Sequence, residues 1–289
     1  MTARTAVICA IAALIGGCGG SPAPDRPSPF VLSGSDAPAT VWAIGDAGHI
    51  GERERTVAKL IGDARPDRLL YLGDVYETGT AEEFEVYDQL YGRLASVTAP
   101  TPGNHEWPAH AEGYDPYWAS KKGQTPPSQY SFRLAGWEII GLNSQLFGDA
   151  EDEQASWLRR KVAAPGTCRL AFWHEPRYSA GTKEGHGDEP TVDPLWSAVE
   201  GRVALVVNAH DHNMQRMKPR DGIVQLISGS GGHNSTYPVD ASDERLAFAD
   251  DEHDGALRIR LSPGRAQLAF VATGGEVLDS STVSCNKGG

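Results

Sequence analysis

Short apolar runs alternate with amphipathic segments in the first third of this chain. The runs at 40–45, 68–73 and 96–100 are short enough for buried strands, and each breaks at a glycine or a proline. Between them, 52–64 and about 80–94 repeat apolar side chains at helical spacing. This strand–helix–strand rhythm predicts a parallel sheet with crossover helices.

The remaining pattern predicts a hairpin, two more helices and further strands. The segments are a hairpin at 130–134 and 137–142, helices at 152–163 and about 192–199, strands at 168–173 and 203–207, and antiparallel strands at 223–228, 256–262 and 265–273. The Pro-, Gly- and aromatic-rich stretch 107–127 is expected to be a loop. Two sheets packed face to face with helices outside fit this pattern, which leaves the strand order open.

Polar side chains follow the strand ends, where open α/β sheets place their sites. They are Asp46, Asp74, Asn104, His174, His210 and His212. Oxygen donors with three imidazoles suit Fe, Zn or Mn. Six donors serve a pair of ions that share one carboxylate, and such a pair is a clamp for in-line attack at phosphorus. A His-x-His segment alone is also compatible with an ordinary loop or core segment.

The N-terminal residues have the layout of an export signal. Arg4 precedes an apolar stretch at 6–15 and Gly16-Gly17-Cys18, and this stretch is too short for a permanent membrane span. Ile15-Gly16-Gly17-Cys18 resembles a bacterial lipobox, in which the cysteine is lipidated; the alternative is a secreted protein with an incidental Cys18. We predict a signal peptide at 1–17, a flexible Pro-, Ser- and Gly-rich tether at 18–39, one large domain at 40–285 and a short tail at 286–289.

Cysteine content and charge agree with export and narrow the partners. Apart from Cys18, the predicted mature chain keeps only Cys168 and Cys285, which would pair in an oxidising compartment. The alternative is two buried free thiols. The formal net charge of -12 argues against a nucleic-acid partner, so any attraction for phosphate must be local.

Five motifs resemble, in order and spacing, those of the calcineurin-like metallophosphoesterases. They are Gly45-Asp46-x-Gly48, Gly73-Asp74, Gly103-Asn104-His105-Glu106, His174 and Ala209-His210-Asp211-His212. The glycine at position 48, where other branches place a metal-binding histidine, is similar to the purple acid phosphatase branch. The resemblance covers about 40–232 and implies an α/β fold, a four-layer αββα sandwich of two mixed β-sheets flanked by helices.

The resemblance also implies which residues hold two metal ions. The first ion would be held by Asp46, Asp74 and His212, and the second by Asp74, Asn104, His174 and His210, with Asp74 as the bridge. The ions implied are Fe with Zn, Mn or a second Fe. A metal-activated hydroxide would attack phosphorus, while Asn104 and His105 would contact the substrate.

A histidine would protonate the leaving group, and two are candidates. His105 directly follows Asn104, and His186 lies in the loop 179–188, where phosphatases of this branch place histidines. The alternative for His186 is a mobile surface histidine among glycines.

The chain departs from the purple acid phosphatase pattern near the bridging aspartate. The tyrosine ligand of that branch would fall at Glu77, with Tyr76 one place early. If Asp74 to Tyr76 were extended, Tyr76 would face the same side as Asp74 and be a further metal ligand. His49 is expected to be a helix-entry residue, and Ala209 in place of the usual glycine to tighten its turn slightly.

Four other residues are weaker candidates. Glu106 and Asp211 are expected to orient His105 and neighbouring imidazoles as hydrogen-bond acceptors, or else to be solvated charges. Arg177 is a candidate substrate contact, with a surface ion pair as the alternative. His233 ends the glycine-rich stretch 228–233 and is expected to face the pocket, unless this stretch is a simple turn.

The sequence thus predicts an exported, membrane-anchored, acid phosphatase-like enzyme that hydrolyses small phosphate monoesters. The alternatives are a phosphodiesterase acting on nucleotides or phospholipid headgroups, and a surface binding protein without turnover. Membrane contact is expected through the lipid anchor alone. Specificity is expected to lie in loops such as 107–127 and 179–188.

Overall fold

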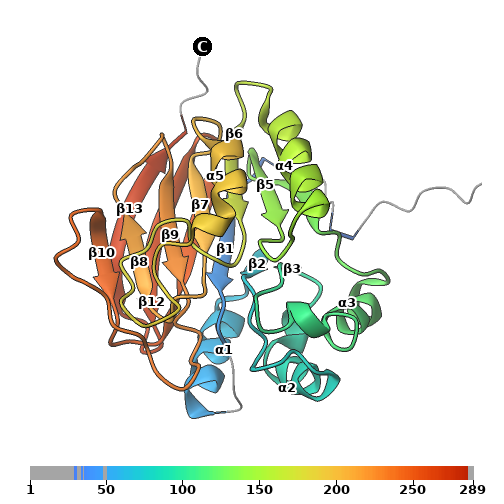
Figure 1. Cartoon of the computed structure of the whole chain (residues 1–289). Helices are drawn as coiled ribbons and strands as arrows, with labels where there is room; N and C mark the ends of the chain where they lie inside the picture. Colours follow the sequence, from blue (N-terminus) through green and yellow to red (C-terminus); the bar gives the residue numbers. More distant parts are fainter. Residues whose placement is uncertain (1–28, 31–33, 35, 48–50, 286–289) are drawn as a thin grey trace, which may run out of the picture.

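The computed structural model describes residues 29–30, 34, 36–47 and 51–285 (Figure 1). The predicted signal peptide with Cys18, most of the predicted tether, His49 and the tail at 286–289 lie outside the described residues. Within the described part, no helix is both long and apolar enough to cross a membrane.

The described helices are three longer ones and two short ones, joined by single 3₁₀ turns. They are α1 (Glu52–Ala64), α2 (Ala81–Tyr91), α3 (Tyr114–Lys122), α4 (Asp149–Val162) and α5 (Asp193–Val199), with the 3₁₀ turns η1 (Gly92–Leu94), η2 (Trp107–Ala109) and η3 (Pro190–Val192). Thr80 caps α2 by accepting a hydrogen bond from the backbone of Glu83, whose carboxylate bonds back to the N–H of Thr80.

The strands form two mixed sheets. The first sheet has the order β13 (Val277–Ser284), β12 (Arg265–Ala272), β11 (Gly255–Ser262), β1 (Ala39–Ile44), β2 (Arg68–Tyr71) and β3 (Thr98–Pro100). The second has the order β10 (Leu246–Asp250), β8 (Met214–Met217), β9 (Val224–Ser228), β7 (Leu205–Asn208), β6 (Cys168–Phe172), β5 (Trp137–Leu142) and β4 (Gln129–Leu134). β1, β2 and β3 are parallel, as are β5, β6, β7 and β9, while the outer pairs are antiparallel.

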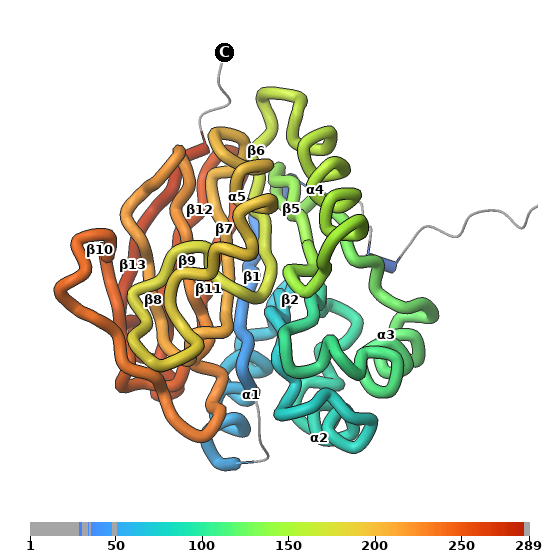
Figure 2. The backbone as a smooth tube through the Cα atoms, in the orientation of Figure 1, coloured from blue at the N-terminus to red at the C-terminus, as the bar shows by residue number. Residues whose placement is uncertain are grey.

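Three hydrophobic clusters separate four layers. The inner faces of both sheets share the first cluster, with side chains such as Val41 and Leu257 from one sheet and Leu170 and Val207 from the other. The second cluster fills the space between the first sheet and α1–α3, and the third lies between the second sheet and α4–α5. Figure 2 shows α2 and α3 together on the side of the molecule away from β10. The predicted αββα sandwich is therefore confirmed.

The structure also corrects parts of the prediction. The stretch 107–127 is not a plain loop, because it contains α3. Tyr117 and Trp118 of this helix pack on Phe84 and Tyr87 of α2, and Pro116 lies in the first turn, where a helix tolerates proline. The strands β8, β10 and β13 were not predicted, and β9 pairs in parallel with β7 besides its antiparallel pairing with β8.

The predicted disulfide is present and lies far along the strands from the strand-end residues. Cys168 and Cys285 are bonded, with their Cα atoms 5.5 Å apart. Cys168 is the first residue of β6, whereas His174 follows the other end of that strand. The bond thus joins the segment after β13 of the first sheet to the start of β6 in the second sheet, at the opposite end of β6 from His174.

Candidate metal centre

Sharp turns after the strands bring the candidate ligands to one place. Asp46, Asp74 and His210 each follow a strand with a left-handed backbone, at φ values of 57°, 56° and 69°. Asp and His are among the non-glycine residues that tolerate this conformation best, and three such residues at one site indicate a functional constraint. Each turn therefore places its side chain at the edge of the sheet that the preceding strand ends on.

Glycines allow the turns from different strands to meet. Gly73 has φ 100°, and a Cβ on it would lie 2.4 Å from the backbone nitrogen of Gly103. A Cβ on Gly45 would lie 2.5 Å from the Cβ of Ala209. Ala209 therefore fits only because its neighbour across the site is glycine. The absence of side chains at positions 45 and 73 therefore allows the turns after neighbouring strands to lie this close.

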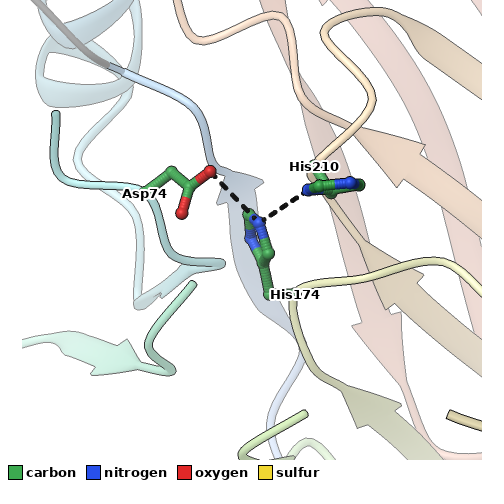
Figure 3. Close-up of side chains that lie close together, drawn as sticks. All are labelled: Asp74, His174 and His210. Atoms are coloured by element: carbon green, nitrogen blue, oxygen red, sulfur yellow. Dashed lines mark hydrogen bonds and ion pairs between the residues drawn. The ribbon is translucent and has the colours of Figure 1, made fainter. Parts of the chain in front are cut away.

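His174 lies at the centre of one group of ligand atoms. Its Nε2 is 3.2 Å from Oδ2 of Asp74, 3.0 Å from Oδ1 of Asn104 and 3.2 Å from Nδ1 of His210. Oδ1 of Asn104 is also 3.0 Å from Nδ1 of His210. Figure 3 shows the ring of His174 between Asp74 and His210. Four donors from four different strand ends thus surround a space that suits one cation.

The other ring nitrogen of His174 fixes its tautomer. Nδ1 lies 2.8 Å from the carbonyl oxygen of Leu72, to which it donates its proton. Nε2 therefore is the ring nitrogen that faces the group of donors. Metal-binding histidines characteristically make this second hydrogen bond.

A second group lies beside Asp46. Oδ2 of Asp46 accepts a hydrogen bond from the backbone N–H of His210 at 2.9 Å, while Oδ1 lies 3.8 Å from Nε2 of His212. Within the described part of the chain, this buried Oδ1 has no hydrogen-bond partner. A buried carboxylate oxygen without a partner is costly, and a cation between it and His212 would satisfy it. Asp74 belongs to the first group through its contact with His174, and its bridging role toward the second group stays a prediction.

Charge and burial prepare these groups for a cation. Burial, reinforced by the nearby His174, lowers the pKa of His210 to about 4, and burial lowers the pKa of His212 to about 2. Both imidazoles are therefore neutral and able to bind metal. Burial opposes protonation of His174, but the charge of Asp74 raises the pKa of His174 to about 10. Without a metal, a proton on His174 balances Asp74, and a bound cation would replace that proton.

His105 borders this centre on its open side. Its backbone N–H donates to Oδ1 of Asp74 at 3.1 Å, and its Nε2 lies 4.0 Å from Oδ2 of the same residue. Nδ1 lies 2.8 Å from the carbonyl oxygen of Glu77. The ring is 40% exposed, so it faces solvent as well as the ligand group.

His186 also lies at the centre. Its ring centroid is 4.7 Å from that of His210 and 5.8 Å from that of His212. Nδ1 of His186 is 3.2 Å from Oδ1 of the fully buried Asp211. The side chain is 16% exposed, so His186 is held in place and is not a loose surface histidine.

Tyr76 does not have the conformation on which its expected role depended. The backbone from Asp74 to Tyr76 is not extended, because both residues have positive φ, at 56° and 67°. The ring of Tyr76 is buried in the cluster beneath α1 and α2, with Val57 and Tyr91. This expectation was wrong in its premise, since the turn that directs Asp74 to the edge sends Tyr76 into the core.

Glu106 and Arg177 also have other contacts than expected. Oε2 of the buried Glu106 accepts hydrogen bonds from the backbone N–H groups of Asp74, at 2.9 Å, and Val75, at 3.3 Å. Glu106 therefore braces the turn of Asp74 and does not orient His105. Arg177 pairs with Asp193 and stacks on Tyr178, which is the surface ion pair given as its alternative.

Two residues on the segment after β9 also lie beside His212. His233 lies 4.9 Å from His212 between ring centroids and bonds to Glu77 through Nε2 at 2.7 Å. Tyr237 was not predicted: its ring stacks on His212 at 4.1 Å, and the ammonium of Lys183 lies 4.2 Å from its centroid. Nothing in a polar, aromatic-poor stretch of sequence marks Tyr237, because its role depends on where this segment folds back.

Comparison with known proteins agrees with this geometry. The chain matches the family described as calcineurin-like phosphoesterase over residues 39–214. It is 24% identical over 179 residues to the glycerophosphodiester phosphodiesterase GpdQ of Enterobacter lignolyticus, which covers 56% of this chain and 62% of the relative. The chain thus spans less than two thirds of the length of this curated relative.

Solved structures share the fold. The purple acid phosphatase PPD1 of yellow lupin superposes with a TM-score of 0.69 and 17% identity, over 88% of this chain and 55% of the other. GAP50, the anchor in the inner membrane complex of Plasmodium, superposes with a TM-score of 0.69 and 16% identity, over 86% of this chain and 89% of the other. With the strand-end donors in place and the family matched over most of the chain, the protein belongs to the calcineurin-like phosphoesterase family.

Proposed function

We propose that this protein is a two-metal hydrolase of phosphate monoesters on small molecules. The observation that carries this proposal is the pair of donor groups, one around Nε2 of His174 that includes Asp74, and one between Asp46 and His212. The donors fit Fe with Zn, Mn or a second Fe, because they combine carboxylate and amide oxygens with neutral imidazoles. When bound, such ions polarise the phosphoryl group and activate water.

The residues of the chain supply positioning and a proton. Asn104 and His105 border the open side of the centre, where a phosphoryl oxygen would lie. His186 lies above His210, and Asp211 accepts the proton of its Nδ1, so its Nε2 is free to face a leaving group. We assign His186 as the proton donor and His105 as the residue that stabilises charge on the phosphoryl oxygens.

A phosphodiesterase activity is the second candidate, and the naming of the relative from Enterobacter lignolyticus favours it. The same clamp serves both reactions. Rates on p-nitrophenyl phosphate and on bis(p-nitrophenyl) phosphate, measured with purified protein of known metal content, separate the two. Faster release from the monoester supports our proposal, and faster release from the diester overturns it in favour of the second candidate.

A binding protein that kept the fold without turnover is the third candidate. The number of donors argues against it, because a site without chemistry has no need of three buried or half-buried imidazoles and two buried carboxylates in one place. Protein that carries two metal ions per chain and hydrolyses neither ester would support this candidate.

We further propose that the protein is exported and held at a membrane by a lipid on Cys18. The layout of 1–18 and the disulfide between Cys168 and Cys285 support export, because disulfides persist in oxidising compartments. Expression of the full chain with Cys18→Ser tests this proposal. The variant should move from the membrane fraction to the soluble exported fraction, and equal distribution of both forms would contradict a lipid anchor.

A further inference from the structure

The position of His186 depends on how its loop is held. The loop 179–188 connects β6 to η3 and α5 and contains Gly181, Gly185 and Gly187, of which the last two have φ values of 82° and 116°. Glycines leave a loop many accessible conformations. A histidine on such a loop stays over the metal centre only if both ends of the loop are fixed.

Asp211 fixes the inner side of the loop. Its Oδ1 accepts from Nδ1 of His186 at 3.2 Å and from the backbone N–H of Gly187 at 3.3 Å, and its Oδ2 accepts from the hydroxyl of Ser179. Asp211 lies between two ligand histidines in the sequence. This contact therefore ties the loop to the metal-binding turn.

Arg245 fixes the outer side and connects the two ends of the loop. Its Nη1 donates to both carboxylate oxygens of Asp188, each at 2.8 Å, and its Nη2 donates to the carbonyl oxygen of Ser179 at 2.9 Å. Asp243 accepts from Nε of Arg245, at 2.9 and 3.0 Å, and from Nη2 at 2.6 Å. These hydrogen bonds fix the orientation of the guanidinium. One side chain thus bonds to the first and the last residue of the loop.

Arginine suits this task for a geometric reason. Its planar fork makes several parallel hydrogen bonds at once, whereas the ammonium of lysine is a single point charge on a flexible stem. The pair with Asp188 is partly exposed, so its contribution to overall stability is small. Its effect is to restrict where the loop can lie.

We propose that Arg245 is a positioning residue for the reaction. It closes the loop 179–188 so that His186 stays 4.7 Å from His210 between ring centroids, where it can give a proton to the leaving group. Arg245 itself touches neither the metal ligands nor the open side of the centre and acts through His186. This inference rests on the proposed function, in which His186 is the proton donor.

The first test compares esters that differ in their need for a proton donor. Phenolate leaves less readily than p-nitrophenolate, so the hydrolysis of phenyl esters depends more strongly on protonation. Arg245→Met should lower kcat on phenyl phosphate on the order of tenfold to a hundredfold, and lower kcat on p-nitrophenyl phosphate much less. Arg245→Lys should fall between Arg245→Met and the unchanged protein. If the unchanged protein prefers diesters, the corresponding diesters are used.

A matched control separates positioning from general damage. Arg216 makes a similar two-bond pair with Asp279, at 2.7 and 2.9 Å, which joins β8 to β13 and includes no residue of the loop. Arg216→Met should leave both rates unchanged. If Arg245→Met does not fold, Asp188→Asn weakens the same contact from the other side. Equal losses on both esters would overturn the inference.

The second test asks whether Arg245 acts through His186. In a background of His186→Ala, Arg245→Met should cause no further loss on phenyl phosphate, because the group that it positions is gone. A further loss as large as in the unchanged background would overturn the inference.

A third measurement does not depend on turnover. Lys183 is exposed in the loop, so trypsin cleavage after Lys183, followed by mass spectrometry, reports how often the loop opens. Arg245→Met should accelerate this cleavage severalfold, and Arg216→Met should not. Unaltered cleavage would overturn the tether. If the unchanged protein hydrolyses none of the esters, the proposed function fails, while this measurement still decides whether Arg245 holds the loop.

Discussion

Nδ1 of His186 lies 3.2 Å from Oδ1 of Asp211, the residue between the two metal-ligand candidates His210 and His212. A single buried carboxylate therefore couples the loop that carries the proposed proton donor to the turn that carries two imidazoles. Displacement of either segment moves the other. This coupling explains how a glycine-rich loop can hold a histidine at a fixed place beside the candidate metal ligands.

Replacement of the shared aspartate should remove both metal and activity. Asp74→Ala takes away the carboxylate that lies 3.2 Å from Nε2 of His174 and that we propose to bridge both ions. We expect loss of both metals and of ester hydrolysis, measured by elemental analysis and phosphate release. Asp63→Ala, an exposed change on α1, is the control. Full metal content in Asp74→Ala would show that the ions lie elsewhere.

Replacement of His105 should affect the rate but not the metal. His105→Ala leaves every assigned ligand in place, so the metal content should be unchanged while kcat falls on the order of 10²–10⁴-fold. His110→Ala, which removes a nearby histidine paired with Asp115, should keep both. Full turnover by His105→Ala would refute its assigned role.

Glu106 should matter for stability through the turn of Asp74. Glu106→Ala leaves the backbone N–H groups of Asp74 and Val75 without their buried acceptor, which costs about 1–3 kcal/mol in the free energy of unfolding. Glu106→Gln keeps an acceptor oxygen of the same shape and should recover most of this loss. Urea unfolding of the three proteins measures the difference, and equal losses in Ala and Gln variants would contradict the bracing role.

Tyr237 should support metal binding through its packing on His212. Removal of the ring in Tyr237→Ala frees the imidazole that it stacks against at 4.1 Å, so metal affinity should fall about tenfold. Tyr237→Phe keeps the stacked ring and should bind metal as the unchanged protein does. Metal titration measures both. A loss in the Phe variant as large as in the Ala variant would assign the effect to the hydroxyl instead.

Reduction of the disulfide should lower stability but not activity. The bond closes a loop between positions 117 residues apart, and its loss should cost about 2–4 kcal/mol in the free energy of unfolding. Folded, reduced protein should still hydrolyse its ester, because the bond lies at the opposite end of β6 from His174. Unfolding with and without reductant measures the cost, and the double variant with Cys168→Ser and Cys285→Ser should not respond to reductant.

Much of the fold was predictable because the hydrophobic pattern within each short segment determines its helix or strand. The pattern at 52–64 predicted α1 with the bounds that it has, since helical spacing is a local property. The strand ends that carry Asp46, Asp74 and His174 were also predictable, because a short apolar run followed by a polar residue marks the edge of a buried sheet. The motifs then indicated the family.

Contacts between distant segments decided the rest. The sequence could not order β8, β9 and β10, because strand pairing depends on hydrogen bonds between segments far apart in the chain. It placed Tyr76 on the metal side by assuming extended backbone, and only the left-handed turn at Asp74 shows that this ring goes to the core.

The sequence by itself determined which chemical groups this protein brings to its sheet edge, since residue type and strand-end position are local properties. Only the tertiary structure decided which of them work together. Arg245 donates hydrogen bonds to both ends of the loop 179–188, and Asp211 accepts one from His186. No spacing in the sequence relates these residues to one another. Hydrogen bonds of this kind have direction and short range, so they exist only once the segments that carry both partners have folded together.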